Sequence, residues 1–237
     1  MNPYQKLLER KRKWTPVQTT AGTCKQGAEE AIYRALALRH MEVPVGDFIS
    51  NALTTEIPEL AREVLGSNVK DEENHDLALG YIANAYGVDQ KAEQEALRLK
   101  AAWEAHPDHT ITKALVAERA IFFVLLPFFR FNGDAGMRTV SADISRDEQI
   151  HVAVNSLAHT ELGYNISPSL DKLRKATINW VMQPLGQHTD KYLDKKFWLD
   201  SSDRLMYEGK APELAETKAA RMPAFFEHSN VNLPQYA

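Results

Sequence analysis

Two segments of the chain have the form Glu-x-x-His, with a carboxylate and an imidazole three residues apart. They are Glu72 with His75, and Glu148 with His151. In an α-helix, residues at this spacing lie on one face, with about 5–6 Å between their Cβ atoms. Each pair can therefore offer one oxygen and one nitrogen to a metal ion. Two such pairs on different helices, joined by one glutamate from each of two further helices, form the dinuclear carboxylate sites of four-helix bundles.

A further glutamate precedes the most apolar stretch of the chain. Glu118 stands shortly before residues 120–129, whose sequence is AIFFVLLPFF. A carboxylate beside such a stretch is costly to bury unless it is paired or bound to a metal ion. Glu118 is therefore predicted to be the single glutamate ligand on the helix that precedes the second Glu-x-x-His pair.

The corresponding glutamate before the first pair has three candidates, Glu29, Glu30 and Glu42. Glu42 lies 30 positions before the first pair begins, and the same separation divides Glu118 from the second pair. This internal symmetry favours Glu42 as the sixth ligand, with Glu30 as the main alternative.

The types of ligand predict the metal. Carboxylates suit hard ions such as Fe and Mn, and imidazole adds borderline character. The chain has one cysteine, Cys24, so neither an internal disulfide nor a zinc site of the multi-cysteine type is expected. We expect a dinuclear centre of two metal ions, Fe and/or Mn. The remaining histidines are expected at the surface or behind the ligands: His40, His106, His109, His159, His188 and His228.

Long stretches rich in Ala, Leu, Glu and Lys, separated by a few Gly and Pro residues, predict an all-α fold. We expect helices over residues 25–42, 58–86, 90–105, 110–129, 138–162 and 168–186, followed by a looser end. Pro44 and Gly46 are expected to end the first of these helices. Each Glu-x-x-His pair then falls inside a long helix, as the metal site requires.

Charge and hydropathy exclude two other classes of protein. The 28 basic and 32 acidic residues give a net charge of −4, which does not suit a dedicated nucleic-acid-binding protein. The longest apolar run, residues 120–129, is shorter than the ~20 residues that a membrane-spanning helix needs. Residues 1–13 are polar and basic, unlike a signal peptide. These features predict a cytoplasmic protein with no nucleic-acid or membrane partner.

The segment at residues 144–151, with the sequence ISRDEQIH, closely resembles the fourth-helix motif of the small, radical-generating subunit of class I ribonucleotide reductase. Further similarities follow in the same order and cover most of the chain. They lie at residues 4–16 (YQKLLERKRKWTP), 57–60 (IPEL), 117–129 (AERAIFFVLLPFF), 225–227 (FFE) and 235–237 (QYA).

The resemblance implies a ferritin-like four-helix bundle with additional helices over residues 1–222, and a flexible C-terminal tail over residues 223–237 that docks a partner. Such a subunit uses O₂ to oxidise a dinuclear Fe or Mn centre. It supplies the oxidising equivalent to a large catalytic subunit that makes deoxyribonucleotides, and it is usually a homodimer. The implied metal ligands are Glu42, Glu72, His75, Glu118, Glu148 and His151.

The resemblance also implies roles for residues around the metal ions. Asp147 would accept a hydrogen bond from the first histidine ligand or link it to Trp14, because carboxylates often orient ligand imidazoles. Trp14 would deliver electrons to the centre or take a radical from it, and Tyr236 would relay the radical to the large subunit. Phe122 and Ile144 would wall a dry pocket beside the metals.

One position departs from the family pattern. Most members carry a radical-storing tyrosine one turn after the first paired histidine, where this chain has Leu79. Tyr81 is turned about 200° away from Leu79 on a helix, and Tyr33 lies on the first predicted helix. Either the oxidising equivalent stays on the metals, as in members with Mn/Fe or Mn/Mn centres, or another aromatic residue holds it. Alternative functions are a stand-alone ferritin-like di-iron oxygenase or hydroxylase, and an iron-storage or oxidase protein.

Overall fold

The computed structural model describes residues 2–215 of the chain. Every regular element in this range is helical, which confirms the all-α prediction, and its one isolated β-bridge joins Gly186 to Asp194. The α-helices are α1 (Pro3–Glu9), α2 (Glu29–Ala37), α3 (Glu42–Ala52), α4 (Glu59–Tyr86), α5 (Gln90–Ala105), α6 (Thr110–Ala117), α7 (Phe123–Asn132), α8 (Ala135–Glu161), α9 (Pro168–Met182) and α10 (Lys195–Glu208). Tyr236, His228 and the predicted tail, with its boundary at residue 222, lie outside the described residues.

Shorter turns complete the chain. They are η1 (Leu38–Met41), η2 (Glu118–Phe122), η3 (Lys191–Leu193) and η4 (Pro212–Leu214). Of these, η2 is a π-helical turn and the others are 3₁₀ turns. The π turn joins α6 to α7 without a break in the helical course.

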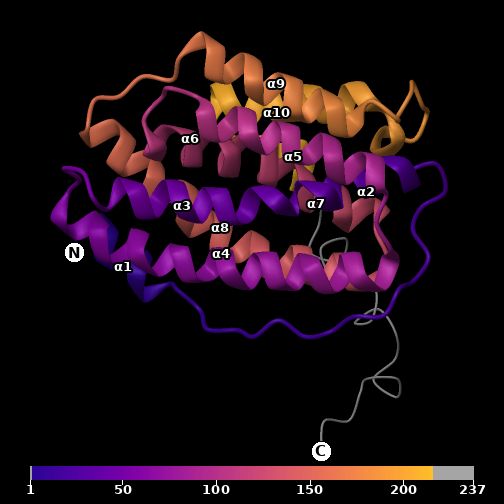
Figure 1. Cartoon of the computed structure of the whole chain (residues 1–237), viewed down its shortest axis with the longest axis horizontal. Coiled ribbons are helices and arrows are strands. Elements are labelled where there is room, and N and C mark those ends of the chain that lie inside the picture. Colours follow the sequence, from indigo (N-terminus) through magenta and orange to yellow (C-terminus); the bar gives the residue numbers. More distant parts are fainter. Residues whose placement is uncertain (1, 216–237) are drawn as a thin grey trace, which may run out of the picture.

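The helices predicted to carry the metal ligands surround one interior. α3 packs along α4 and against α6, while α8 packs against α4, α6 and α7. Figure 1 shows α3 and α4 side by side, with α8 behind them. α9 and α10 pack on each other, and both contact η2. The segments predicted to carry the six ligands therefore face one another.

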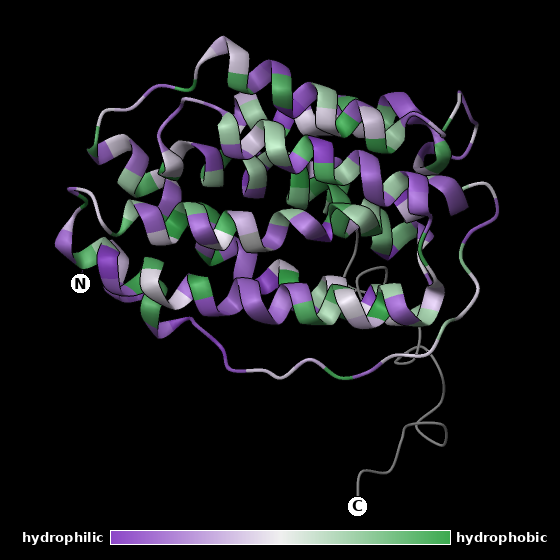
Figure 2. Ribbon diagram, viewed as in Figure 1, coloured by the Kyte–Doolittle hydropathy of each residue, from purple (hydrophilic) through white to green (hydrophobic). Residues whose placement is uncertain are grey.

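The pattern of buried residues on α4 explains its position. Apolar residues recur every three or four positions and place one face of this 28-residue helix in the core. The middle of that face is polar yet equally buried, because Asn68, Asp71, Glu72 and His75 occupy it. Figure 2 shows hydrophilic residues along much of the outer face of α4 and hydrophobic residues gathered in the interior around α7. A polar centre inside an apolar helix bundle is the principal feature of the fold.

The prediction for the first helix is wrong at both ends. Its residues form α2, the 3₁₀ turn η1 and then α3, and both Pro44 and Gly46 lie inside α3. Pro44 is the third residue of α3, where its missing N–H costs no hydrogen bond, since the first four N–H groups of a helix lack an intrahelical acceptor. Gly46 lets α3 approach α4 closely, because a Cβ there would lie 3.4 Å from the Cβ of Glu72.

The other predicted helices differ from the observed ones mainly at their ends. The helix expected from residue 138 begins three residues earlier, where Asp134 caps α8 by accepting a 2.8 Å hydrogen bond from the amide of Met137. The helix expected over residues 110–129 contains the π turn, and the one expected to reach residue 186 ends at Met182. None of the helices within residues 2–215 is long and apolar enough to cross a membrane.

Candidate metal centre

The six predicted ligands come together in the interior, and each is at most 1 % exposed. They form two groups in which one oxygen or nitrogen atom per residue lies within 4.8 Å of the others. The first group is Glu42, Glu72, His75 and Glu148, and the second is Glu72, Glu118 and His151. Glu72 belongs to both groups, and Glu148 also reaches both histidines, at 3.3 Å from His75 Nδ1 and 3.7 Å from His151 Nδ1. The two groups adjoin each other through Glu72, and each could hold a metal ion.

Four separate elements supply these ligands. Glu42 is the first residue of α3, and one Glu-x-x-His pair lies on each of α4 and α8. Glu30, the alternative to Glu42, is on the surface, where its 68 % exposed side chain forms an ion pair with Arg34. The geometry thus places Glu42 in the site and Glu30 outside it.

Glu118 begins the π turn η2. Single π turns inside α-helices occur often at functional sites. Ser202 of α10 donates its hydroxyl to the carbonyl of Ala120 in this turn, at 2.7 Å, and Asn155 of α8 donates its amide to Glu118 Oε2. These two contacts hold the turn from outside and leave Glu118 Oε1 directed into the cluster without a hydrogen-bond partner.

The orphaned atoms of the cluster point to a missing positive charge. Eight buried ligand atoms have no hydrogen-bond partner: Glu42 Oε2, both oxygens of Glu72, both oxygens of Glu148, Glu118 Oε1, His75 Nδ1 and His151 Nδ1. Buried polar atoms are normally paired, and each exception requires an explanation. These eight atoms lie together and are all potential metal ligands, although other residues, such as Tyr4 and Ser141, also have a buried side-chain atom without a hydrogen-bond partner.

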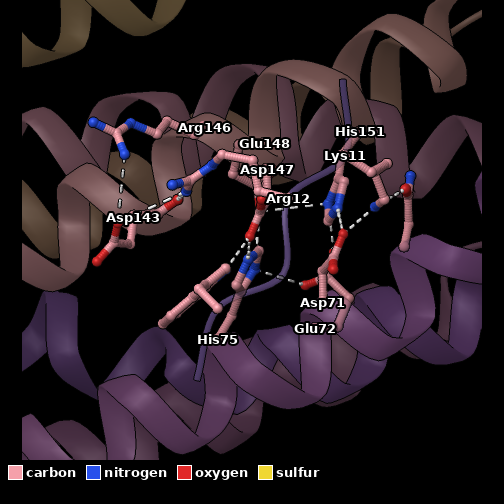
Figure 3. A network of polar contacts seen from close by, with 12 residues as sticks. Lys11, Arg12, Asp71, Glu72, His75, Asp143, Arg146, Asp147, Glu148 and His151 are labelled. Atoms are coloured by element: carbon pink, nitrogen blue, oxygen red, sulfur yellow. Dashed lines mark hydrogen bonds and ion pairs between the residues drawn. The ribbon is translucent and has the colours of Figure 1, made fainter. Parts of the chain in front are cut away.

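The other ring nitrogen of each histidine faces an aspartate from the opposite helix. Asp147 of α8 lies 3.4 Å from His75 Nε2 of α4, and Asp71 of α4 lies 2.9 Å from His151 Nε2 of α8 (Figure 3). A carboxylate at Nε2 favours the tautomer with its proton there, so Nδ1 is left free to bind a metal ion. The expected contact of Asp147 with the first histidine is present.

The role of Asp71 beside His151 was not predicted, although the sequence contains a pattern that indicates it. Both pairs are preceded directly by aspartate, so the repeated motif is Asp-Glu-x-x-His. On a helix, neighbouring residues point about 100° apart. Each aspartate can thus leave its own metal pair and reach across to the histidine of the other helix.

The N-terminal segment covers this arrangement. Trp14 Nε1 donates a 2.5 Å hydrogen bond to Asp147 Oδ2, and the indole stacks on the His75 ring with 6.2 Å between centroids. Lys11 forms an ion pair with Asp71 and a 2.8 Å hydrogen bond with Asn68 Oδ1. Trp14 is therefore linked to the centre through Asp147, as expected, while the role of Lys11 was not anticipated.

Electrostatics of the metal-free cluster favour bound cations. Burial raises the pKa of Glu42 and Glu118 well above the usual range, and the charges of nearby glutamates raise it further. Burial alone would lower the pKa of the two histidines, but the surrounding carboxylates outweigh it. The pKa of His75 is raised well above normal, and that of His151 to about 10. When no metal is bound, protons on these side chains therefore offset the negative charge of the carboxylates.

The donor set fits two divalent cations. Four glutamates carry four negative charges, which two divalent ions neutralise while both histidines stay uncharged. Three or four protein ligands per ion, dominated by carboxylate oxygen with one imidazole each, suit Fe and Mn. The charge of the four glutamates therefore matches that of two divalent ions, while the buried Asp147 keeps its own charge beside His75 and Trp14.

Comparison with known proteins identifies no matching family model, no similar curated protein and no similar solved structure.

The aromatic and apolar residues singled out from the sequence lie as follows. Phe122 on η2 and Ile144 on α8 are buried, one helical turn from Glu118 and Glu148 respectively. Leu79, at the usual tyrosine position of the resembled family, is buried on α4. Tyr81 is partly buried on the same helix, and Tyr33 packs against Tyr86 with 5.1 Å between ring centroids.

The five remaining histidines within residues 2–215 lie outside the cluster. His40 pairs with Glu93 at 2.6 Å, and His159 lies 3.1 Å from the hydroxyl of Thr112. His106, His109 and His188 accept hydrogen bonds from backbone amides two residues further along the chain. Each has a local structural partner.

Proposed function

We propose that the chain is a ferritin-like four-helix bundle with a dinuclear Fe and/or Mn centre, and that it acts as the small subunit of a class I ribonucleotide reductase. The observation that carries the metal centre is the convergence, from four helical elements, of eight buried ligand atoms that have no hydrogen-bond partner. The subunit assignment rests on the sequence resemblance together with the contact from Trp14 through Asp147 to His75.

Each residue of the cluster has a defined task in this proposal. Glu42 and His75 would hold one ion, Glu118 and His151 would hold the other, and Glu72 and Glu148 would contribute carboxylate oxygens beside them. The aspartates keep the imidazoles oriented with Nδ1 toward the ions. When bound, the two ions supply redox chemistry, in which reaction with O₂ or a reduced oxygen species yields an oxidising equivalent.

Trp14 could carry the oxidising equivalent from the metal ions to the protein surface. Its indole is partly exposed and touches Asp147, whose carboxylate also faces the ligand His75. Asp147 can accept the indole proton while an electron leaves the ring, so no charge is stranded in the apolar core. Trp14 is thus suited to pass electrons between the centre and the surface.

The proposed partners follow from the same assignment. A large catalytic subunit would receive the oxidising equivalent and reduce ribonucleoside diphosphates. This chain would dock onto the large subunit through its tail at residues 223–237, and Tyr236 would relay the radical. The small subunit would itself be a homodimer. Because the chain has a single cysteine, Cys24, the thiol chemistry of nucleotide reduction would lie in the partner.

The test is reconstitution with Fe, with Mn or with both, followed by O₂ and a reduction assay with a candidate large subunit. We expect about two metal ions per chain, an EPR-active oxidised state and partner-dependent reduction that requires residues 223–237. Metal binding without any partner-dependent reduction would refute the subunit assignment and leave the metal centre standing.

A second function is favoured by Leu79. A buried leucine at the usual tyrosine position removes the common radical store and leaves an apolar side chain on the ligand helix α4. A stand-alone di-iron oxygenase acting on an apolar substrate would use the same ligands. Oxygen-dependent hydroxylation by the chain alone, unaffected by deletion of residues 223–237, would favour this function over the first.

A further inference from the structure

One short segment touches both ligand helices from outside. Lys11 contacts Asp71 and Asn68 on α4, and Trp14 contacts Asp147 on α8. Between them, Arg12 donates to the carbonyl of Asp143 on α8 at 3.3 Å. We call residues 11–14 the N-terminal strap. Figure 3 shows Lys11 and Arg12 among the aspartates behind the two histidines.

The strap contacts the aspartates behind the two histidines through different kinds of side chain. Behind His75 stands Asp147, whose partner in the strap is the neutral indole of Trp14. Behind His151 stands Asp71, whose partner is the ammonium of Lys11. The Lys11 and Asp71 side chains are 13 % and 12 % exposed, so this ion pair is largely removed from solvent. The two metal positions are therefore inequivalent in their surroundings as well as in their ligands.

Without Lys11, no lysine or arginine side chain would contact Asp71. Its neighbour in sequence, Glu72, is itself a buried carboxylate. Breaking a largely buried pair by removing one partner is strongly destabilising, and the remaining carboxylate gains by turning toward water. If Asp71 turned outward, the Nε2–H of His151 would lose its acceptor, and the ring would no longer be fixed with Nδ1 toward Glu72, at 2.9 Å.

We propose that Lys11 is a positioning residue for one metal position only, the one formed by Glu72, Glu118 and His151. It acts through Asp71, which it holds against His151 Nε2. The inference deepens the proposed function and rests on its dinuclear centre. Loss of a residue that orients a metal-ligating histidine typically costs 10–100-fold in metal affinity. The cost should fall on one ion of the pair and spare the other.

The experiment titrates the metal-free, full-length chain with Zn²⁺ and follows heat and stoichiometry. Lys11→Met keeps the alkyl stem and removes the charge, whereas Lys11→Arg keeps the charge. Lys13→Met is the matched control, because Lys13 is exposed in the same strap. We expect two ions in the wild type, about 10–100-fold weaker binding of one ion in Lys11→Met, partial or full rescue in Lys11→Arg, and no change in Lys13→Met.

A second readout needs no metal. In chain labelled with ¹⁵N-histidine, Lys11→Met should shift the His151 Nε2–H signal and leave that of His75 in place. On an Asp71→Asn background, Lys11→Met should add little, since the proposed effect passes through Asp71.

The outcomes separate the two claims. If a folded Lys11→Met chain bound both Zn²⁺ ions with equally reduced affinity, or bound both with unchanged affinity, the positioning role of Lys11 would be refuted. The proposed metal centre would not be affected by that result. A wild-type chain that binds no Zn²⁺ would overturn the metal centre. In that case, a shifted His151 Nε2–H signal in Lys11→Met would support the positioning of this ring by Lys11, and an unchanged signal would refute it.

Discussion

Addition of a divalent metal to the metal-free chain should release protons, because cations and protons compete for the same buried cluster. Without metal, the surrounding carboxylates raise the pKa of His75 well above its usual value and that of His151 to about 10, which favours the protonated imidazoles. The raised pKa of Glu42 and of Glu118 favours their protonated forms as well. Metal ligands must be deprotonated, so about two to four protons should leave per pair of ions, the lower figure from the imidazoles alone.

Calorimetric titration in two buffers of different ionisation enthalpy measures this number. At pH 7 the observed heat should vary linearly with the ionisation enthalpy of the buffer, with a slope equal to the protons released. Glu30→Gln, which changes an exposed glutamate, should leave the slope unchanged. Metal binding with no proton release would refute the electrostatic reasoning, because the bound ions would then lie away from the cluster.

The same shifts fix how metal-free stability depends on pH. The stability contributed by a histidine with a raised pKa is complete below about pH 6.5 and is lost as pH rises through the folded value, about 10 for His151. Deprotonation of Glu42 and Glu118 also costs stability as pH rises. Glu72 acts oppositely: burial alone would raise its pKa, but the two histidines hold it below normal, so its contribution is lost in acid. The gain in melting temperature on metal binding should thus grow from pH 6 to 9.

Substitutions at three further positions test a metal ligand, the electron path and the apolar core one at a time. Glu118→Gln should lower the metal content from two ions per chain to one, measured by atomic emission, whereas Glu30→Gln should keep both. Trp14→Phe should retain both ions yet lower partner-dependent nucleotide reduction by about 10–100-fold, because the contact with Asp147 is lost; unchanged turnover would remove Trp14 from the path. Ile144→Ala should cost about 2–5 kcal/mol of unfolding free energy in urea, against about 0.5–1.5 kcal/mol for Ile144→Val, and a cost below that of the valine variant would contradict its place in the core.

Much of the site could be predicted because it is encoded in local spacing. The i, i+3 pairs fix which residues share a face of α4 and α8, and the apolar run after Glu118 indicates that this carboxylate is buried. The prediction of a helix over residues 90–105 is confirmed at both ends: in the structure Asp89 caps its start, and Pro107 follows its end. Such signals lie within a few residues of the feature they determine.

The rest depends on contacts that no local pattern contains. Lys11 meets Asp71 across 60 residues of chain, and nothing in the strap distinguishes it from the neighbouring lysine, Lys13. The π turn at Glu118 has the composition of an ordinary helix and is held by Ser202 of α10. Pro44 was misinterpreted because a proline can either follow a helix or occupy its first turn, and packing of α3 on α4 decides between them.

The most direct test of the central claim is anomalous diffraction from crystals of the chain grown with Fe or Mn. The account predicts two peaks inside the bundle, one bounded by Glu42 and His75, the other by Glu118 and His151, with Glu72 between them. A single peak, or peaks outside this cluster, would contradict it.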